Sequence, residues 1–588
     1  MNHQNEDNRF GRKMFLRFLI PSLTTALFLG FSNIVDSLVI GQRMQEDGLA
    51  AVSLTLPLYM ILYMLIFGLS TGGSLNYARL LGLGKVREAR RHFTQTECAA
   101  LICALVFVLT GLFLTPQVVR LLGALPEQGA VYQYTYDYVQ ILLFAAPSFF
   151  LFFTLYEFVR SDNGEVRATV GFAVTTVTAI TLSFVFVLGL DTGVRGTIYA
   201  AVIGHAAGIL IFATHFLAPG HVLRLTFGRL SVSEIRASFF KGLAGSSRYI
   251  MQFVFLYAAN RILLQLHGTR GVVVFGLILN VSYIALSVFD GCLATLQPLV
   301  ATFIGEKSRS SARDVLRRSM LFGLSVTFLL VAAGELFAPF ICRGFGITDA
   351  DLIEAGAYAV RIYLISVLIA GCNTLYGGYA QAAGHERWCW VMTLLRNFAV
   401  LMLCMLGFSL TGRLTLFWLM YPVTEIVSLL IWMGAIRYSG SKLLDHTDDE
   451  RILRTGISGS DDDISRVLQE TEAFCEKWEA SFKQSYYVTL TVEEICTAIL
   501  ENAFGKSDSA KQRGYIQITL VSMPDGSFEL HLRDNARFYN PFDAVTRQIS
   551  QTDSGEVVAT VGILMVKQKA KGFFYRRYLG FNVLVITV

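Results

Sequence analysis

About twelve apolar stretches, each near 20 residues long, fill the first three quarters of this 588-residue chain. A helix of that length crosses the roughly 30 Å hydrocarbon core of a bilayer. The composition agrees, because 54% of the residues are hydrophobic, only 16% are charged and the mean hydropathy is +0.52. We therefore expect an all-α polytopic membrane protein. The expected spans are 14–40, 50–78, 93–115, 133–158, 168–190, 195–218, 246–266, 271–303, 315–338, 357–381, 388–409 and 414–436.

The loops between these spans alternate between strongly basic loops and loops with a single arginine. Basic loops stay on the cytoplasmic side of a membrane. Because residues 1–13 are polar and lead directly into a full-length span, they do not resemble a cleavable signal peptide. We expect a multi-pass protein of the cytoplasmic (inner) membrane with both termini in the cytoplasm. The net charge of +5 is small and lies mostly in these loops, so it indicates topology rather than nucleic-acid binding. The basic loops hold Arg79, Lys85, Arg87, Arg90, Arg91, Arg160, Arg167, Arg224, Arg229, Arg236, Lys241, Arg248, Lys307, Arg309, Arg313, Arg317 and Arg318.

The chain also contains an internal repeat, in which residues 68–90 match residues 291–313 at an offset of about 223. The matched pairs include Gly68 with Gly291, Gly82 with Gly305 and Arg90 with Arg313. A repeat of six helices returns the chain to its starting side, so the two halves share one orientation and are related by an axis along the membrane normal. We expect an N-lobe at 10–218 and a C-lobe at 237–436 around a central cavity. Such an architecture is typical of alternating-access transporters.

The composition changes near residues 437–460, where DHTDDER and SGSDDD introduce many charges. We expect a linker there and a soluble domain at 461–588. Helical periodicity marks DISRVLQETEAFCEKWEASF and YYVTLTVEEICTAILENAF, whereas YIQITLVSM, SFELHLRD and FNVLVITV alternate as strands. The sequence MPDGSF is typical of a hairpin turn. The pattern predicts an α+β sandwich after the membrane part.

Ionisable groups inside a membrane are costly, which makes each a candidate for ion or substrate translocation. Asp36 lies about five residues before Gly41, hence roughly 8 Å below the outer end of the first span at 1.5 Å per residue. Its carboxylate, with Asn33 beside it, could take up H⁺ or Na⁺ in one state and release it in another. A buried aspartate held by neighbouring hydroxyl groups is the structural alternative. Pro21 offers a bend in the same span.

Five more polar residues lie within the second half of the membrane part. We expect Asp290 and Glu425, both mid-span, to line the cavity, with a hydrogen bond between helices as the alternative. For Asn260 and Gln297, a hydrogen bond between helices is favoured over a translocation role. Arg396 is expected to extend to the nearby membrane surface. The nine cysteines contain no CxxC pair, so we expect reduced thiols and no cysteine metal site.

Six segments of the membrane part form a specific combination. The first half contains SNIVDSLVIGQ, LAAVSLTLPLYMIL and GLSTGGSLNYARLLGLGKVREAR, and the second contains GCLATLQPLVATFIGEKS, YGGYAQAAGHERWCWVMTLLRN and YPVTEIVSLL. Together they resemble the MATE family of multidrug-efflux transporters over nearly all of residues 10–436. The resemblance implies a secondary antiporter that exports amphiphilic, mainly cationic compounds against H⁺ or Na⁺. It also implies that Asp36 is the family's first-helix acid and a candidate Na⁺ ligand.

The resemblance has one departure on the fifth helix. The bacterial and archaeal family often carries Asn-x-x-x-Asp there, and this chain has Ala179 and Ser183 at those positions. The carboxylate partner of Asp36 is therefore missing. Hydroxyl groups of Thr178, Thr181 or Ser183 are left to help bind an ion, which leaves the coupling ion open.

The C-terminal segment carries LTVEEICTAILENAF, LRDNARFYNPF and VGILMVKQKAKGFFYRRYLGFNVLVI in that order. These pieces resemble the GHKL ATP-binding fold, and within it the small anti-sigma-factor serine kinases. The resemblance places Glu494, Asp534 and Gly562 at nucleotide-binding positions. However, Ala498 and Ala536 replace the family's Mg²⁺-holding Asn and its base-contacting Gly. We therefore expect a regulatory domain, with neither kinase nor ATPase activity, in which these changes weaken the case for ATP and Mg²⁺ as cofactors.

These features favour a transporter, not an enzyme, that needs no cofactor besides its coupling ion. A regulatory protein is the expected partner of the C-terminal domain. A flippase for lipid-linked oligosaccharide or lipid is a second interpretation, disfavoured because few basic residues lie at mid-membrane depth. A membrane sensor that signals through a kinase-like C-terminal domain is a third, disfavoured by the altered nucleotide motifs.

Overall fold

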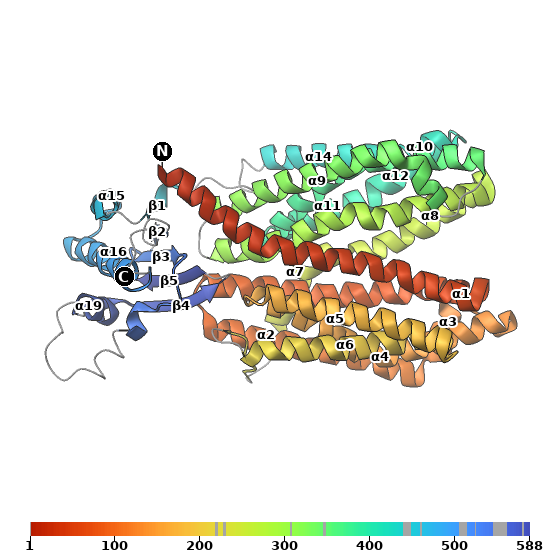
Figure 1. Cartoon of the computed structure of the whole chain (residues 1–588), viewed down its shortest axis with the longest axis horizontal. Helices are drawn as coiled ribbons and strands as arrows, with labels where there is room; N and C mark the ends of the chain where they lie inside the picture. Colours follow the sequence, from red (N-terminus) through yellow and green to blue (C-terminus); the bar gives the residue numbers. More distant parts are fainter. Residues whose placement is uncertain are drawn as a thin grey trace.

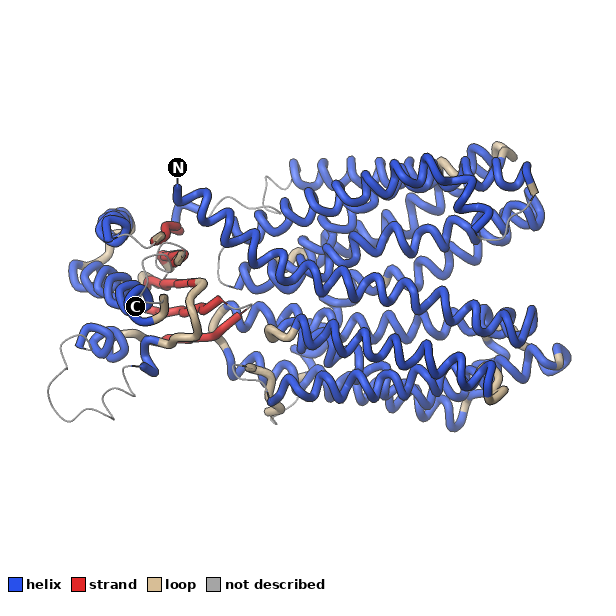
Figure 2. The backbone as a smooth tube through the Cα atoms, in the orientation of Figure 1, coloured by secondary structure: helices blue, strands red, loops and turns tan. Residues whose placement is uncertain are grey.

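The computed structural model places a long helical bundle beside a small domain that contains a sheet (Figures 1 and 2). It describes residues 2–217, 221–226, 231–305, 309–344, 349–438, 449–458, 461–504, 514–523, 525–544, 561–578 and 581–588, without the side chains of 2–11, 13–14, 29–38, 40–50 and 53 in the first helix. Both chain termini lie toward the end of the bundle that carries the sheet (Figure 1). We call this end the domain end.

Eleven helices in the described part of the chain are long and apolar enough to cross a membrane, and Phe15–Phe28 is a shorter apolar helix. Together they match the predicted spans in order and place. The first half of the bundle comprises α1 (Asn2–Gly82), α2 (Val86–Phe113), α3 (Thr115–Leu121), η1 (Pro126–Gln128), α4 (Ala130–Ser161), α5 (Glu165–Ser183), η2 (Phe184–Gly189), α6 (Arg195–Ala213) and η3 (Thr214–Leu217). The second half comprises α7 (Val232–Ser246), α8 (Arg248–Gly305), α9 (Arg309–Gly344), α10 (Ala350–Ala382), α11 (Glu386–Leu394), η4 (Leu395–Ala399), α12 (Val400–Ser409), α13 (Leu414–Phe417) and α14 (Met420–Tyr438).

The two longest helices each contain a change of direction. In α8, Gly268 has φ 60° and ψ −153°, a conformation that breaks the helix. In α1, Phe18 and Leu75 belong to one buried cluster, although a straight helix would separate them by roughly 85 Å. Each of these helices therefore supplies two membrane crossings.

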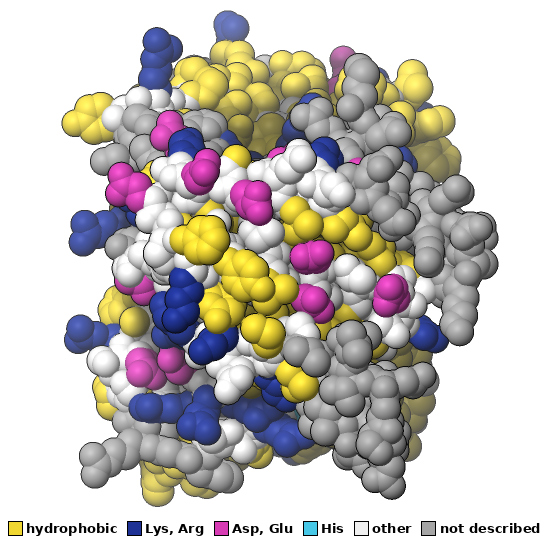
Figure 3. Space-filling view, turned by 90° about the vertical axis from the view of Figure 1, so that its left-hand side faces the viewer, with side chains coloured by type: hydrophobic (Ala, Val, Ile, Leu, Met, Phe, Trp, Pro, Cys, Tyr) yellow, Lys and Arg dark blue, Asp and Glu magenta, His cyan; other side chains and the backbone are white. Residues whose placement is uncertain are grey.

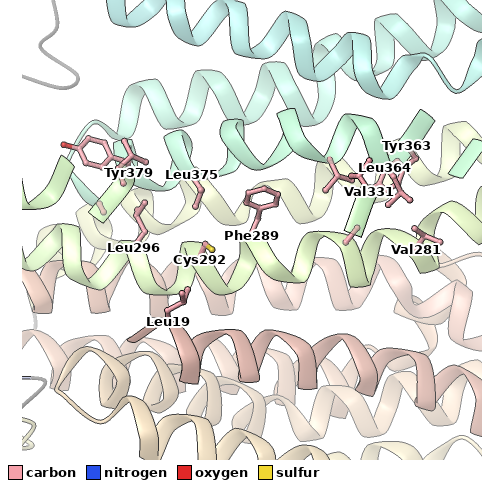
Figure 4. Close-up of a cluster of buried hydrophobic side chains, with 14 of the residues drawn as sticks. Leu19, Val281, Phe289, Cys292, Leu296, Val331, Tyr363, Leu364, Leu375 and Tyr379 are labelled. Carbon is pink, nitrogen blue, oxygen red and sulfur yellow. The ribbon is translucent and has the colours of Figure 1, made fainter. Parts of the chain in front are cut away.

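Two large buried clusters correspond to the two predicted lobes. One is built from α1, α2, α4, α5 and α6 around residues such as Phe150, Phe158 and Phe212. The other is built mainly from α8, α9 and α10, and Leu19 of α1 packs into it near Leu296 and Cys292 (Figure 4). Apolar packing within each lobe, rather than one common core, leaves the boundary between the lobes as a separate interface.

The lobes meet closely at the domain end. Gly68 and Gly72 of α1 face Ser238 and Gly242 of α7, and a Cβ atom on Gly72 or Gly242 would overlap the backbone of the opposite helix. Two small residues spaced four apart on each helix allow this close approach. Further along α1, Gly305 of α8 lies against the backbone of Arg79 and Gly82. We call these contacts the seam.

Polar contacts reinforce the seam through α7. Asn76 of α1 donates to Ser238 Oγ at 2.8 Å, and Lys241 Nζ donates to Asn76 Oδ1 at 3.3 Å. On the other side, Gln381 of α10 donates to the Lys241 carbonyl at 2.9 Å. Sequence analysis assigned Lys241 to a basic loop, but it lies buried in α7, because this helix connects the lobes.

The small domain is a five-stranded antiparallel sheet with helices on one face. The strand order is β1-β2-β3-β5-β4, with β1 (Ile452–Ile457), β2 (Ile516–Ser522), β3 (Phe528–Asp534), β4 (Gly572–Tyr578) and β5 (Phe581–Thr587). The turn η5 (Asp449–Arg451) precedes the sheet, and α15 (Asp461–Lys477), α16 (Phe482–Asn502) and α19 (Val561–Lys569) pack on it. The predicted helices and the strands β2, β3 and β5 are confirmed. The sheet begins with β1, inside the range 437–460 that the sequence assigned to a linker.

Local interactions explain two of these elements. The β2–β3 hairpin turns through Gly526 at φ +78°, and Asp525 accepts the backbone N–H of Ser527 at 3.1 Å. Helix α16 begins with a capping box, in which Ser481 and Gln484 each bond the other's backbone N–H. The hairpin predicted from MPDGSF is thus confirmed.

Candidate substrate and ion sites

The first-helix acid cannot be placed, because the side chains of Asp36 and Asn33 lie outside the described residues. The helix that carries them is held in place nearer its N-terminus. There the Pro21 carbonyl accepts hydrogen bonds from the hydroxyl groups of Thr25 and Thr169, each at 3.1 Å. Thr169 belongs to α5, so α1 and α5 are tied together beside the predicted bend. Asp36 as an ion ligand stays a prediction.

The C-terminal half of α5, residues 175–183, carries hydroxyl groups and no acid. Ser183 is buried at the end of α5, and its Oγ has no hydrogen-bond partner among the described residues. Thr181 is exposed and Thr178 half-buried. A π-helical segment, η2, follows directly after Ser183. Such segments occur frequently at functional sites, so Ser183 stays a candidate ligand.

Aromatic rings gather between the lobes. One group contains Tyr63 and Phe67 of α1 with Phe153 of α4. The ring centres of Phe67 and Phe153 lie 5.3 Å apart. Tyr249 of α8 joins this group, stacked on Phe67 at 5.6 Å and tilted against Tyr63 at 5.8 Å. We call these four residues the aromatic group. Aromatic faces attract cations as well as apolar surface, so the group suits amphiphilic cations.

A pair of opposite charges lies beside the aromatic group. The Arg248 guanidinium lies 5.3 Å from the ring centre of Tyr249, and its charge acts on the Asp290 carboxylate. Asp290 is exposed, although it lies near the middle of the membrane-spanning second part of α8. Sequence analysis placed Arg248 in a basic loop, but it begins α8 and faces this acid. An accessible carboxylate near aromatic rings could bind a cation.

Glu425 takes part in a network of hydrogen bonds between helices. Arg396 Nε donates to both carboxylate oxygens of Glu425, at 2.8 and 3.0 Å, and Asn373 donates to Glu425 Oε2 at 2.7 Å. Arg396 also donates to Thr374 Oγ1 at 3.0 Å and to the Ala370 carbonyl at 3.1 Å. The prediction that Arg396 extends to the membrane surface was wrong, because a carboxylate on α14 holds it between helices. For Glu425, the alternative of a bond between helices is the one observed.

The two neutral candidates differ from each other. Gln297 is buried and donates to Gln381 Oε1 at 3.0 Å, so it joins the network behind the seam, as the favoured interpretation held. Asn260 is exposed on the first part of α8, in the neighbourhood of Tyr257. The structure thus connects Gln297 to the interface between the lobes and leaves Asn260 accessible.

Sequence analysis missed several buried ionisable groups in the N-lobe, among them Glu97 and His205. Glu97 of α2 is buried, and both its carboxylate oxygens lack a hydrogen-bond partner in the described part of the chain. His205 of α6 lies between Phe149 and Phe152, with ring centres 4.5 and 4.7 Å away, and its Nδ1 is 3.3 Å from Ser148 Oγ. Both residues fall inside predicted spans, so a search for every ionisable residue within the spans would have found them.

In the small domain, Glu494 and Gly562 lie in direct contact. Gly562, in the first turn of α19, packs so closely on the Glu494 carboxyl group that a Cβ atom would overlap it. Burial, with the neighbouring Glu493 carboxylate, raises the pKa of Glu494. One turn further along α16, Ala498 is buried in the domain core. The side-chain amide of Asn502, one turn further on, donates to the Ala498 carbonyl at 3.0 Å. The described residues therefore do not fit a Mg²⁺–ATP site.

Asp534 closes the end of β3 and is almost fully buried. Its Oδ1 accepts the side-chain amide of Asn582 at 2.7 Å and the backbone N–H of Ala536 at 2.9 Å. Burial outweighs these bonds and raises the pKa of Asp534 from 3.8 to about 6. The acid that the resemblance placed at a nucleotide-binding position thus takes part in the packing of the sheet.

This shifted pKa predicts how the small domain responds to pH. Asp534 binds a proton more tightly in the folded state, so its contribution favours folding at low pH and is lost as pH rises from about 4 to 6. Above pH 6 the buried carboxylate costs up to about 3 kcal/mol. Asp534→Asn should therefore stabilise the domain above pH 6 and remove this part of the pH dependence, as measured by chemical unfolding of the full chain at pH 4.5 and 7.5. Exposed Asp543, changed to Asn, is the control; a destabilised Asp534→Asn protein at pH 7.5 would contradict the expectation.

Comparison with known families decides what the membrane part is. The MatE family model matches residues 21–188 and 247–406, which together are more than half of the chain. The chain belongs to the MATE family. The two matched segments fall in the two lobes, and their starts are separated by nearly the offset of the internal repeat. The MATE resemblance drawn from the sequence is confirmed, and with it a transporter rather than an enzyme.

Known MATE proteins align with most of their own length. The chain is 23% identical to the multidrug export protein MepA of Staphylococcus saprophyticus over 428 residues, 71% of this chain and 92% of that protein. It is also 23% identical to MepA of Staphylococcus aureus, over 69% of this chain and 89% of that protein. Among solved structures, a MATE transporter in complex with MaL6 superposes with a TM-score of 0.69 at 19% identity, over 74% of this chain and 97% of that one. An outward-facing MATE-family structure gives 0.67 at 20% identity, with the same coverage.

Within this MATE fold, the acidic and basic groups inside the C-lobe nearly cancel. Arg396 pairs with Glu425, and Arg248 acts on Asp290. A site for lipid phosphates would carry several unpaired basic groups. The charges in the described C-lobe therefore do not favour a flippase.

Proposed function

We propose that this MATE protein exports amphiphilic, mainly cationic compounds by alternating access, driven by the inward flow of H⁺ or Na⁺. The observation that carries the proposal is Asp290, an exposed acid at mid-membrane depth on which Arg248 acts, and Arg248 itself lies against Tyr249 of the aromatic group. Aromatic faces supply apolar contact and attract positive charge, and the carboxylate supplies a counter-ion. The relatives named as multidrug export proteins support the export of drug-like compounds.

We further propose that the domain end faces the cytoplasm. Basic residues gather at the helix ends beside the α1–α2 turn, including Arg79, Arg87 and Arg90, and such basic segments are retained on the cytoplasmic side. The closed seam then lies on the cytoplasmic side, so the conformation described is closed toward the cell interior. Release of substrate to the outside fits this arrangement.

Asp36 is the proposed coupling acid, with Ser183 as a candidate neutral ligand. The buried Ser183 hydroxyl, unpartnered in the described part of the chain, could support either H⁺ or Na⁺ binding. With no second acid in residues 175–183 of α5, one carboxylate carries the coupling. This assignment rests on the family match and on the depth of Asp36 in its helix.

Transport in proteoliposomes tests the proposal. Uptake of a fluorescent organic cation should follow an imposed H⁺ or Na⁺ gradient, and Asp36→Asn should lower gradient-driven uptake by at least about tenfold, since the coupling carboxylate is lost. Asp290→Asn should weaken binding of the cation while a neutral analogue of similar size still binds. The control is Glu354→Gln, an exposed acid on α10.

Two results would overturn these assignments. Gradient-driven uptake unchanged in Asp36→Asn would remove the coupling role of that acid. If Asp290→Asn bound the cation as tightly as the parent protein does, Asp290 would not belong to the substrate site.

The small domain is proposed to regulate transport rather than to catalyse a reaction. The contact between Glu494 and Gly562, together with buried Ala498, argues against ATP hydrolysis and against a kinase-type sensor. Seen from the domain end, charged side chains of both signs surround hydrophobic ones (Figure 3). Exposed hydrophobic residues of this domain include Phe482, Tyr486 and Phe538. Such a surface suits a protein partner.

A further inference from the structure

The sheet of the small domain has two buried faces. Along each strand the side chains alternate, so Leu584 and Ile586 of β5 face the helices of the domain. Their neighbours Val583 and Val585, with Phe581, belong instead to the same apolar cluster as the C-lobe. We call the face that carries Phe581, Val583 and Val585 the outer face. The transporter itself is therefore the second layer that covers this sheet.

The outer face contacts both halves of the transporter. On the C-lobe side, the Arg533 guanidinium of β3 lies 4.7 Å from the ring centre of Phe303, near the end of α8. On the N-lobe side, Phe574 of β4 lies against the turn between α1 and α2, where its Cβ is 3.2 Å from the Cβ position of Gly84. Gly84 has φ +72°, a turn conformation that leaves room for the ring. Figure 1 shows the sheet lying across the end of the bundle.

We call the contact of Arg533 with Phe303 and the contact of Phe574 with Gly84 the two anchors. They lie on opposite sides of the seam. Gly84 follows Gly82 by two residues, and Phe303 precedes Gly305 by two, whereas Gly82 and Gly305 are themselves in contact. Any motion that separates the lobes at this end must move Gly84 away from Phe303. The sheet would then have to detach from one of them.

The two anchors differ in strength. The C-lobe side shares a continuous apolar cluster with Tyr515, Phe581, Val583 and Val585. On the N-lobe side, the described contacts are the ring of Phe574 at the α1–α2 turn and Arg17 of α1, whose guanidinium lies 5.5 Å from the ring centre of Phe581. Because buried apolar area sets the strength of such contacts, the α1–α2 turn is the side that should detach first.

We propose that the sheet is a clamp that holds the domain ends of the two lobes together, and that the transporter opens at this end only when Phe574 leaves the α1–α2 turn. This inference rests on the proposed alternating access of the two lobes. A partner bound to the helices of the domain would alter transport by loosening or tightening this contact. The fused domain thereby acts through mechanical restraint and needs no chemistry of its own.

The test measures the distance between the lobes without measuring transport. Fluorophores on unnatural amino acids at exposed Arg87 and Arg387, at the domain ends of the two lobes, report separation by single-molecule energy transfer in the full chain. Phe574→Asp should raise the widely separated population by about fivefold, the effect of losing one modest contact. The control is Phe482→Asp, a phenylalanine of the same domain that is 91% exposed and should leave the distribution unchanged.

A milder variant keeps the test decisive if Phe574→Asp unfolds the sheet. Phe574→Ala should shift the distribution in the same direction while thermal unfolding of the domain is retained. Distributions equal to the parent in Phe574→Asp and Phe574→Ala would overturn the clamp. A shift in distance in a protein that moves no compound would keep the clamp and overturn the proposed efflux, so the two failures are distinguishable.

Discussion

Gly242→Ala is expected to force the lobes apart at the seam and to lower transport by about tenfold. The new Cβ atom would overlap the Gly68 carbonyl, which is backbone and cannot move aside as a flexible side chain would. Overpacking of this kind costs about 1–3 kcal/mol. Because the cost falls only on the state with a closed seam, the population should shift toward the state that is open at the domain end. The energy-transfer pair at Arg87 and Arg387 measures the shift, and proteoliposome uptake measures the loss.

The matched control is Gly276→Ala, also within a membrane helix of the second half. No heavy atom lies within 4 Å of a Cβ added at Gly276, so this change should leave both the distance and the uptake as they are. Gly72→Ala offers an independent check, because its Cβ atom would overlap the Ser238 carbonyl from the opposite side of the seam. If Gly242→Ala kept the parent distribution of distances, the seam would not be the contact that closes this end.

The membrane fold could be predicted from the sequence because hydrophobicity and loop charge act residue by residue along the chain. Each span is read from its own stretch, and the repeat needs only a comparison of the chain with itself. The seam needs more, since Gly68 and Gly242 are far apart in sequence and their contact depends on how two helices approach. Nothing in a single apolar stretch shows which glycine faces another helix.

The small domain shows where strand prediction fails. The strands β2, β3 and β5 lie inside the sheet and alternate clearly, and the sequence predicted them. The strands β1 and β4 were not predicted, and they are the two edges of the sheet. Edge strands often carry charged side chains that prevent pairing with other chains. The YRRY sequence of β4 follows this rule, so its charges hide the alternation that identifies a strand.

The candidate site could be predicted only in part, because its contacts join residues that are distant in the sequence. Asp290 and Glu425 were both found as mid-span acids, yet one is exposed and the other accepts three hydrogen bonds from two side chains of neighbouring helices. The difference comes from residues distant in the chain: Arg248, in the first part of α8, acts on Asp290, whereas Arg396 and Asn373 of other helices bond Glu425. Depth in the membrane identifies a costly charge, but only the packing of helices shows which charge is already neutralised.

Removing one member of the Arg396–Glu425 pair is expected to destabilise the C-lobe by about 3–5 kcal/mol, because the remaining charge would stay buried without its partner. Both side chains are mostly buried, with 18% and 15% of their surface exposed. Arg396→Ala also removes the bonds to Thr374 and to the Ala370 carbonyl, so helices α10, η4 and α14 lose a common cross-link. The expected result is a clear fall in the Tm of the purified protein, larger than that of Asp290→Asn.

The double variant Arg396→Gln with Glu425→Gln separates lost charge pairing from lost packing. Two neutral amides can bond each other, so this protein should recover most of the Tm lost in either single variant. The control is Arg437→Ala, an exposed arginine at the end of α14. If Arg396→Ala unfolds at the parent temperature but fails to transport, Arg396 acts in translocation instead of in packing. In that case, Glu425 would return to the candidate site as an acid that becomes free during the cycle.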